Sequence, residues 1–242
     1  MKYRLIQLYR RLRPNASRVH LYRFLAQAAA SCSRPAVVLD AGSGEAQYAE
    51  LFNAHCYHAV DLAWNRALSY VANLQALAAR DASYDLVICT QVLEHVANPQ
   101  AVLRELYRVL KPGGGLWLTA PFFFAEHMQP RDYYRYTRYG LAHLLRQAGF
   151  QVGAIQPLEG YLATLAYQLE TAARHLPILP RQPSIFALLI AGLSLLLKPL
   201  FLMLYLIFDR IDAIYKFDGA YSKNYAVIAH KPITQDEPSA KA

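Results

Sequence analysis

The sequence predicts an α/β protein built on a mostly parallel sheet. Short apolar segments of strand length alternate with longer segments whose apolar residues recur at helical spacing. The first clear strand runs directly into a glycine-rich turn, which is typical of a strand that leads into a helix. One long apolar stretch, residues 185–208, breaks this alternation and indicates a helical insertion in the chain of 242 residues.

Two helices are expected before the first strand, over residues 3–12 and 17–30, with Pro14 ending the first. The formal net charge of +8 comes entirely from this region, because the other 17 basic residues are balanced by 17 acids. A basic arm of this kind suits an anionic partner, such as lipid headgroups or nucleic acid. The basic residues before the first acid are Lys2, Arg4, Arg10, Arg11, Arg13, Arg18, Arg23 and Arg34.

The alternating region then begins with a buried strand and its turn. Residues 36–40 form an apolar run followed by the turn Ala41-Gly42-Ser43-Gly44. The next elements in order are a helix over 47–52, a strand over 58–61, a weak strand over 70–73, a central strand over 84–89, an amphipathic helix over 99–110, a strand over 116–120, a helix over 138–148 capped by Thr137, and a strand over 151–155.

Residues 160–221 depart from the α/β pattern. A helix over 161–176 is followed by three prolines and then by the apolar run, which Lys198-Pro199 divides into two halves. A final strand over 225–230 must rejoin the sheet. We therefore divide the chain into a basic arm (1–34), a core (35–159 and 222–233), an apolar insertion (160–221) and a polar tail (234–242).

The glycine-rich turn predicts a ligand site. Gly42 and Gly44 allow close approach of a ligand to the backbone, and Asp61 ends the next strand, where a carboxylate can accept both hydroxyls of a ribose. Gln47 stands where a dinucleotide-binding turn would have its third glycine, which argues against NAD. The three cysteines lack metal-ligand spacing, so we expect a reducing compartment and no metal.

Several motifs in order resemble the class I S-adenosylmethionine-dependent methyltransferases, of the type 11 group. Residues 38–44 are similar to the first motif of that family, and Val60-Asp61 matches its ribose-binding acid. The fourth-strand motif resembles residues 84–96, and the turn before the fifth strand resembles residues 110–115. The resemblance implies a Rossmann-like seven-stranded sheet, S-adenosylmethionine as cofactor and transfer of its methyl group.

The resemblance also implies a set of cofactor-binding residues. Ala46 departs from the family by replacing a common third glycine, and Asn73 replaces the usual acid beside the adenine. The segment between Asp61 and Asn73 is short, so we expect a loop in place of a helix there. The implied cofactor-binding residues are Asp40, Gly42, Gly44, Asp61, Leu62, Asn73, Leu74, Thr90 and Gln91.

The segment from Pro121 to Thr137 follows a central strand and is expected to face the methyl acceptor. It resembles a subgroup associated with bacterial surface-glycan or lipid pathways. His127 is the first candidate for a base or acceptor-orienting group, with Asp132 also assigned to catalysis. Tyr133 and Arg135 are assigned to acceptor binding. The alternative is that Asp132 and Arg135 pair to brace this segment; His95 is interpreted as a helix-start residue.

The apolar insertion favours a lipid surface. Residues 185–208 could span a bilayer core as one helix, but a single crossing would separate the final strand from its sheet. We therefore expect a re-entrant or interfacial element, with a soluble lid or a dimer contact as alternatives. The motifs of the DNA methyltransferases are missing, and we expect no nucleic-acid substrate.

The leading hypothesis is a methyltransferase at the cytoplasmic membrane face, bound to an anionic surface and acting on a lipid or lipid-linked acceptor. A rival hypothesis is a non-catalytic, methyltransferase-like membrane adaptor. A third is a methyltransferase of a soluble small molecule. The oligomeric state is left open.

Overall fold

The computed structural model describes residues 16–32, 35–177, 184–215 and 221–233, so the helix expected over 3–12 and the tail lie outside the described residues. The chain divides into two compact units. We call residues 22–156 together with those from 224 onward the sheet unit, and residues up to 21 together with 157–223 the hairpin unit.

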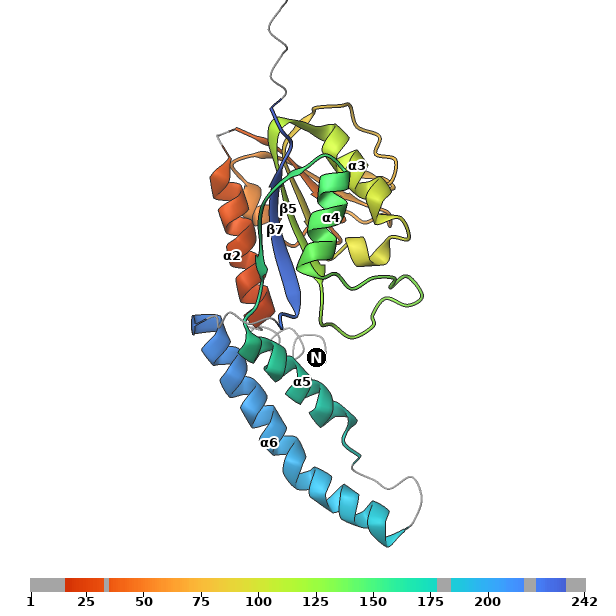
Figure 1. Cartoon of the computed structure of the whole chain (residues 1–242), viewed down its shortest axis with the longest axis vertical. Coiled ribbons are helices and arrows are strands. Elements are labelled where there is room, and N and C mark those ends of the chain that lie inside the picture. The colour runs from red at the N-terminus through yellow and green to blue at the C-terminus, as the bar shows by residue number, and fades with distance from the viewer. Residues whose placement is uncertain (1–15, 33–34, 178–183, 216–220, 234–242) are drawn as a thin grey trace, which may run out of the picture. The chain divides into compact units, whose positions relative to one another are not determined.

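The sheet has seven strands in the order β3-β2-β1-β4-β5-β7-β6, which confirms the predicted fold class (Figure 1). The strands are β1 (Val37–Ala41), β2 (Cys56–Asp61), β3 (Tyr70–Val71), β4 (Tyr84–Thr90), β5 (Leu110–Pro121), β6 (Gln151–Pro157) and β7 (Asn224–His230). Strands β3, β2, β1, β4 and β5 pair in parallel, and β7 pairs antiparallel to β5. The carboxyl ends of β1, β4 and β5 therefore meet at one edge, where α/β sheets bind ligands.

The helices of the sheet unit match the predicted pattern with one exception. Their bounds are α2 (Ala16–Ser31, which begins in the hairpin unit), α3 (Pro99–Val109) and α4 (Arg138–Gln147), with 3-10 turns η1 (Ala49–Phe52) and η2 (Leu93–His95). Thr137 caps α4 as expected, since its Oγ1 accepts a hydrogen bond from the Gly140 N–H at 3.0 Å. The helix predicted over 47–52 is wrong: only η1 forms there, because Ala46 is left-handed and few residues remain before β2.

Helix α2 shows that the predicted arm is divided between the units. The Phe24 ring lies 4.7 Å from the Trp117 ring of β5, and both side chains are buried. Within the sheet unit, Figure 1 shows this part of α2 on one side of the sheet and α3 and α4 on the other. Residues 22–31 therefore contribute to the core instead of extending from it as an arm.

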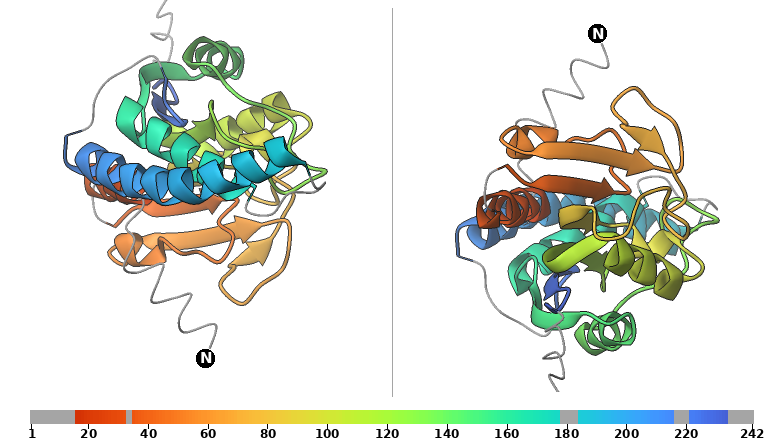
Figure 2. Two further views of the ribbon diagram at one scale, coloured as in Figure 1. Left: turned by 90° about the horizontal axis from the view of Figure 1, so that it is seen from below. Right: turned by 90° about the horizontal axis from the view of Figure 1, so that it is seen from above.

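The hairpin unit contains two antiparallel helices, α5 (Tyr161–His175) and α6 (Ile185–Tyr215), which run side by side in Figures 1 and 2. Helix α6 continues through Pro199, so the predicted division at Lys198-Pro199 is not found in the secondary structure. A proline removes one backbone donor and can bend a helix without ending it.

Two buried carboxylates fix the base of this hairpin. Asp212 accepts a hydrogen bond from the Gly160 N–H at 2.8 Å, which holds the end of α6 beside the start of α5. Asp209 accepts from the Ala16 N–H at 3.0 Å, which caps the start of α2. The polar end of α6 therefore holds the hairpin unit together. The apolar part of α6, nearer Ile185, extends away from these contacts.

Candidate functional site

The glycine-rich turn after β1 is held tightly against β2. The N–H groups of Gly42 and Ser43 both donate to the Val60 carbonyl oxygen, at 2.8 and 3.0 Å. Gly42 has φ +81° and Gly44 has φ +53°, so both adopt the left-handed conformation that favours glycine. The two glycines are therefore needed for their left-handed backbone conformation as well as for the space that a missing side chain leaves.

Asp61 closes this turn from the end of β2. Its Oδ2 accepts from the Gly44 N–H at 2.9 Å and its Oδ1 from the Leu62 N–H at 2.6 Å. Oδ1 also accepts a long hydrogen bond from the Ala63 N–H at 3.4 Å, so only Oδ2 keeps a lone pair unused, and Asp61 remains partly exposed. One ribose hydroxyl can therefore donate to Oδ2 directly, and a second can donate to Oδ1 by replacing the long Ala63 bond.

The space around the two glycines tests whether a cofactor would fit. A Cβ at Gly42 would lie 2.3 Å from Val92 Cγ2, so the side of the turn facing β4 is filled. A Cβ at Gly44 would meet no atom within 4 Å, so that side is open. The turn thus combines a packed side with an open side beside Asp61, which fits a ligand carrying a ribose.

Asp40 occupies a different environment from Asp61. Its side chain is buried and accepts a hydrogen bond from the Tyr57 hydroxyl. Burial raises the pKa of the Asp40 carboxyl to about 6, against the opposing effect of the Tyr57 hydrogen bond. The predicted role in cofactor binding stays a prediction, and the structure shows the Asp40 side chain joined to Tyr57 of β2.

The other predicted cofactor residues lie on neighbouring loops of the sheet unit. Asn73 is exposed, its Oδ1 accepts from the Gln75 N–H at 3.0 Å, and the adjacent Leu74 is buried. Leu62 is exposed beside Asp61, and the segment from there to Asn73 contains no helix, as predicted. Asn73 can serve both the local turn and an adenine amino group, because its carbonyl oxygen has two lone pairs.

The end of β4 holds a backbone conformation that side chains rarely adopt. Gln91 has φ +55°, its N–H donates to the Thr119 carbonyl oxygen at 3.0 Å, and its Nε2 donates to Thr119 Oγ1 at 3.1 Å. Strained residues at the carboxyl end of a central strand are typical of ligand sites. This conformation turns the chain sharply after Thr90, at the edge where the cofactor was predicted.

The segment between β5 and α4 is braced by one ion pair. Arg135 donates two hydrogen bonds to Asp132, both at 2.7 Å, and its remaining donors reach the carbonyl oxygens of Phe124, Ala125 and Tyr134. These hydrogen bonds hold the pKa of the Asp132 carboxyl well below its usual range. All five guanidinium donors are used, which agrees with the bracing alternative; acceptor binding by Arg135 stays a prediction.

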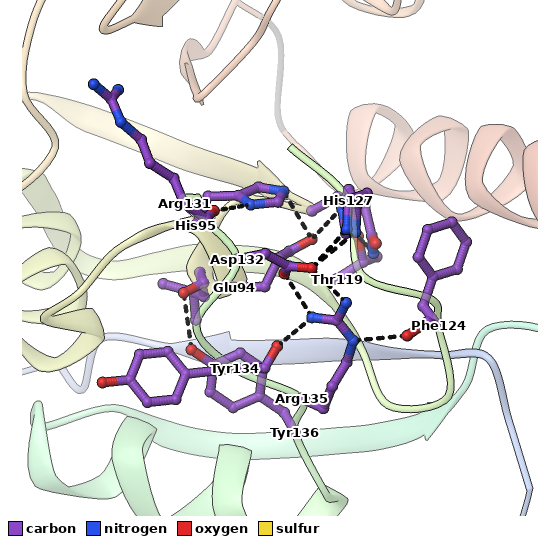
Figure 3. A network of polar contacts seen from close by, with 12 residues as sticks. Glu94, His95, Thr119, Phe124, His127, Arg131, Asp132, Tyr134, Arg135 and Tyr136 are labelled. Carbon is purple, nitrogen blue, oxygen red and sulfur yellow. Dashed lines mark hydrogen bonds and ion pairs between the residues drawn. The ribbon is translucent and has the colours of Figure 1, made fainter. Parts of the chain in front are cut away.

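His127 lies inside this braced segment, next to two residues that follow β4 (Figure 3). Its Nε2 is 4.0 Å from Glu94 Oε1, and the His95 ring is 4.6 Å away, centroid to centroid. Glu94 is fully buried, and burial raises the pKa of its carboxyl to about 7. Glu94 is a site residue that was not predicted from the sequence, although an acid followed by a histidine after a central strand is a pattern typical of functional residues.

Tyr133 is the exposed member of the predicted acceptor-binding pair. Half of its side chain is exposed, and its N–H donates to the Glu94 carbonyl oxygen at 2.8 Å. Phe123 and Met128 of the same segment also expose apolar surface. The segment therefore offers an apolar face close to the polar group formed by Glu94, His95 and His127.

Comparisons with known proteins agree with this geometry. Residues 39–118 match the family model described as a methyltransferase domain. A thiol S-methyltransferase TMT1B of Rattus norvegicus is 48% identical over 61 residues, which are 25% of this chain and 22% of that protein. A ubiquinone biosynthesis O-methyltransferase of Xanthomonas axonopodis pv. citri (strain 306) is 35% identical over 100 residues, 34% of this chain and 42% of that protein.

The structural likeness extends further along the chain. The crystal structure of the Burkholderia thailandensis 1,6-didemethyltoxoflavin-N1-methyltransferase, with S-adenosylhomocysteine bound, has a TM-score of 0.54 at 20% identity and covers 90% of this chain and 78% of that one. That likeness shows the fold, whereas this chain spans less than half the length of the curated relatives named above. The matched family model shows a methyltransferase domain over residues 39–118, and the strand order shows the Rossmann-like fold of the class I S-adenosylmethionine-dependent methyltransferases.

Proposed function

We propose that the chain is an S-adenosylmethionine-dependent methyltransferase that works at a membrane surface on a lipid or lipid-linked acceptor. The observation that carries the methyltransferase part is the turn at Gly42 and Gly44, open on one side and closed by Asp61. S-adenosylmethionine would supply an electrophilic methyl group on its sulfonium. The protein then has to align that group with the acceptor and exclude water.

Each group of residues has a distinct task in this proposal. Asp61 accepts the ribose hydroxyls, and the glycine turn allows the methionine part to approach the backbone. Leu74 offers apolar contact to the adenine. Thr90 and Gln91, at the end of β4, lie between this cofactor side and the His127 segment. His127 is the residue nearest the acceptor and would orient it or take its proton.

The apolar surface of α6 supports the membrane part. Among the described residues, α6 is the one helix long and apolar enough to cross a membrane, and only 11% of its most apolar window is buried. Its buried side chains, which include Ala191, Ser194 and Tyr205, form one face, and large apolar side chains occupy the others. An exposed apolar surface of this extent marks an interaction site, and a bilayer suits it.

The alignment of α5 with α6 bears on the depth of insertion. The hydrogen bond between Gly160 and Asp212 places the start of α5 beside Asp212. Because the two helices are antiparallel and rise equally per residue, the end of α5, 15 residues later, lies beside the part of α6 near Lys198. Arg174 and His175 at the end of α5 therefore lie near the level of Lys198. Residues 185–197 extend about 20 Å beyond this charged level. This arrangement favours a monotopic apolar tip that enters one leaflet.

Membrane binding can be tested with a matched pair of variants. Leu189 and Leu196 are exposed by 66% and 72% on α6, and Tyr139 is exposed by 81% on α4. We expect the double variant Leu189→Glu, Leu196→Glu to move to the soluble fraction, and Tyr139→Glu to stay with the membranes at high salt. Recovery of the unmodified chain in the soluble fraction at low salt without detergent would contradict the membrane proposal.

The reaction can be tested separately from membrane binding. Membranes containing the chain are incubated with S-adenosylmethionine labelled in its methyl group, and the organic-solvent extract is counted. We expect label in the lipid fraction with the unmodified chain and none with Asp61→Ala. Label confined to water-soluble products would overturn the lipid acceptor. Calorimetry that detected no binding of S-adenosylhomocysteine to the purified chain would overturn the methyltransferase.

A further inference from the structure

Three potential metal ligands converge where β4 and β5 end. Glu94 and His95 lie on η2, directly after β4, and His127 comes from the braced segment after β5 (Figure 3). Glu94 Oε1 lies 3.8 Å from His95 Nε2 and 4.0 Å from His127 Nε2. The ligand atoms of all three side chains lie within 4.8 Å of one another.

The hydrogen bonds of the two histidines fix which nitrogen faces Glu94. His95 Nδ1 lies 2.6 Å from the Arg131 carbonyl oxygen, and His127 Nδ1 lies 3.2 Å from the Ala125 carbonyl oxygen. A carbonyl oxygen can only accept, so each Nδ1 carries the proton and donates. With Nδ1 donating in this way, Nε2 is the nitrogen left to face Glu94, and its lone pair is available to a metal ion, as in metal-binding histidines.

Glu94 makes no hydrogen bond to either of these Nε2 atoms. Its side chain is fully buried, and neither carboxylate oxygen accepts a hydrogen bond from another described residue. The two Nε2 atoms are too far away for a hydrogen bond, even to a protonated Glu94. Three potential electron-pair donors thus face one another, and no hydrogen bond joins Glu94 to either Nε2 atom. A buried carboxylate in this position is costly unless it takes up a proton or a cation compensates its charge, and the facing nitrogens favour a cation.

We propose that Glu94, His95 and His127 bind one divalent transition-metal ion of the Zn²⁺ type. Two imidazoles and one carboxylate suit such an ion better than Mg²⁺ or Ca²⁺, which favour oxygen ligands. Ligands of a tetrahedral ion lie about 3.3 Å apart, so the measured 3.8 and 4.0 Å require contraction by about 0.5–0.7 Å. We expect rotation of the two partly exposed rings to bring the ligand atoms to this distance when the ion binds.

The surroundings resemble the outer shell of a metal site. Asp132 accepts from the backbone N–H of His127 at 2.7 Å, its Oδ2 lies 3.5 Å from the ring Nδ1, and it is itself held by Arg135, which fixes the position of His127. Three protein ligands leave one position of a four-coordinate ion open. The His127 side chain is 28% exposed, so this side of the site is accessible. Resting on the proposed methyl transfer, we infer that an anionic oxygen or sulphur of the acceptor occupies this position, so that His127 orients the acceptor through the ion and does not itself take its proton. The site departs from the metal-free site expected from the sequence.

Metal binding is measured on the full-length chain without a histidine tag, purified in detergent and dialysed against a chelator. Zn²⁺ is titrated calorimetrically, and Co²⁺ serves as a probe through its visible absorption. We expect one ion per chain, and no displacement by excess Mg²⁺. His127→Asn should weaken Zn²⁺ binding by at least about 100-fold, since loss of an outer-shell partner alone costs about 10- to 100-fold. Glu94→Gln should have an effect of the same order.

His143→Asn is the matched control, because His143 is an exposed histidine of α4 outside the cluster, and it should bind Zn²⁺ normally. Tryptophan fluorescence checks folding of every variant, since Trp64 and Trp117 both belong to the sheet unit. Absence of stoichiometric binding, or equal binding by His127→Asn and the unmodified chain, would overturn the proposed site. Neither methyl donor nor acceptor is present, so this failure is distinct from failure of the proposed methyl transfer.

Discussion

The packing of Gly42 against Val92 leads to a quantitative prediction for the glycine turn. In Gly42→Ala the new Cβ would lie 2.3 Å from Val92 Cγ2, far inside van der Waals contact, and 3.1 Å from Cγ1, a few tenths of an ångström inside it. Overpacking of this kind costs about 1–3 kcal/mol. The φ of +81° adds about 1–2 kcal/mol for a residue with a side chain. Gly42→Ala should therefore lower the free energy of unfolding by about 2–5 kcal/mol.

Gly44→Ala separates the two contributions. Gly44 is also left-handed, with φ +53°, but a Cβ there meets nothing within 4 Å. Only the conformational cost of about 1–2 kcal/mol applies. The difference between the two variants, about 1–3 kcal/mol, is therefore the contact with Val92. Val92→Ala in the Gly42→Ala background should restore most of that difference.

The assay is urea unfolding of the detergent-solubilised chain, followed by tryptophan fluorescence. Trp117 is buried in β5 and Trp64 is exposed in the loop after β2, so the signal reports the sheet unit. A thermodynamic cycle over Gly42→Ala and Val92→Ala gives the coupling energy directly. Equal destabilisation by Gly42→Ala and Gly44→Ala, with no coupling to Val92, would refute the packing argument.

Three further predictions concern the same site. Ala46→Gly should raise the free energy of unfolding by about 1 kcal/mol in the same urea assay, because Ala46 is left-handed with φ +50°; a loss of stability would contradict this. Asp61→Ala should weaken S-adenosylhomocysteine binding by about 2–4 kcal/mol, or about 30- to 700-fold by calorimetry, because the ribose loses its acceptor; unchanged affinity in a folded variant would exclude that role. Burial raises the pKa of Asp40 to about 6, so the folded state binds the extra proton and the free energy of unfolding should fall, by up to about 3 kcal/mol, as pH rises from about 4 to about 6. Asp40→Asn should remove this slope in urea unfolding at stepped pH, and an unchanged slope would point to another group.

The sequence by itself determined the sheet and its ligand edge. Strand β4 and helix α3 were predicted from the local spacing of apolar residues. The glycine turn and Asp61 were predicted from residue types, because two glycines after a strand are typical of a tight turn. Thr137 and its cap on α4 are likewise local, because the cap forms within four residues. Such features can be predicted from the sequence because the residues that interact to form them are close together along the chain.

The tertiary structure decided what depends on distant residues. The extent of η1 depends on backbone conformation around Ala46, and residues 22–31 join the core because Phe24 meets Trp117, which is far along the chain. The five hydrogen bonds of Arg135 show that it braces this segment, which the sequence offered only as an alternative; acceptor binding by Arg135 stays a prediction.

The group of Glu94, His95 and His127 shows the same limit most clearly. His127 follows a different strand from Glu94 and His95, and only parallel pairing of β4 with β5 brings them together. The burial of Glu94 and the Nδ1 bonds of both histidines also arise from the folded chain. Spacing along a sequence records neither burial nor hydrogen-bond partners. For that reason the sequence indicated a cofactor edge, whereas the proposed cation site could be inferred only from the three-dimensional arrangement.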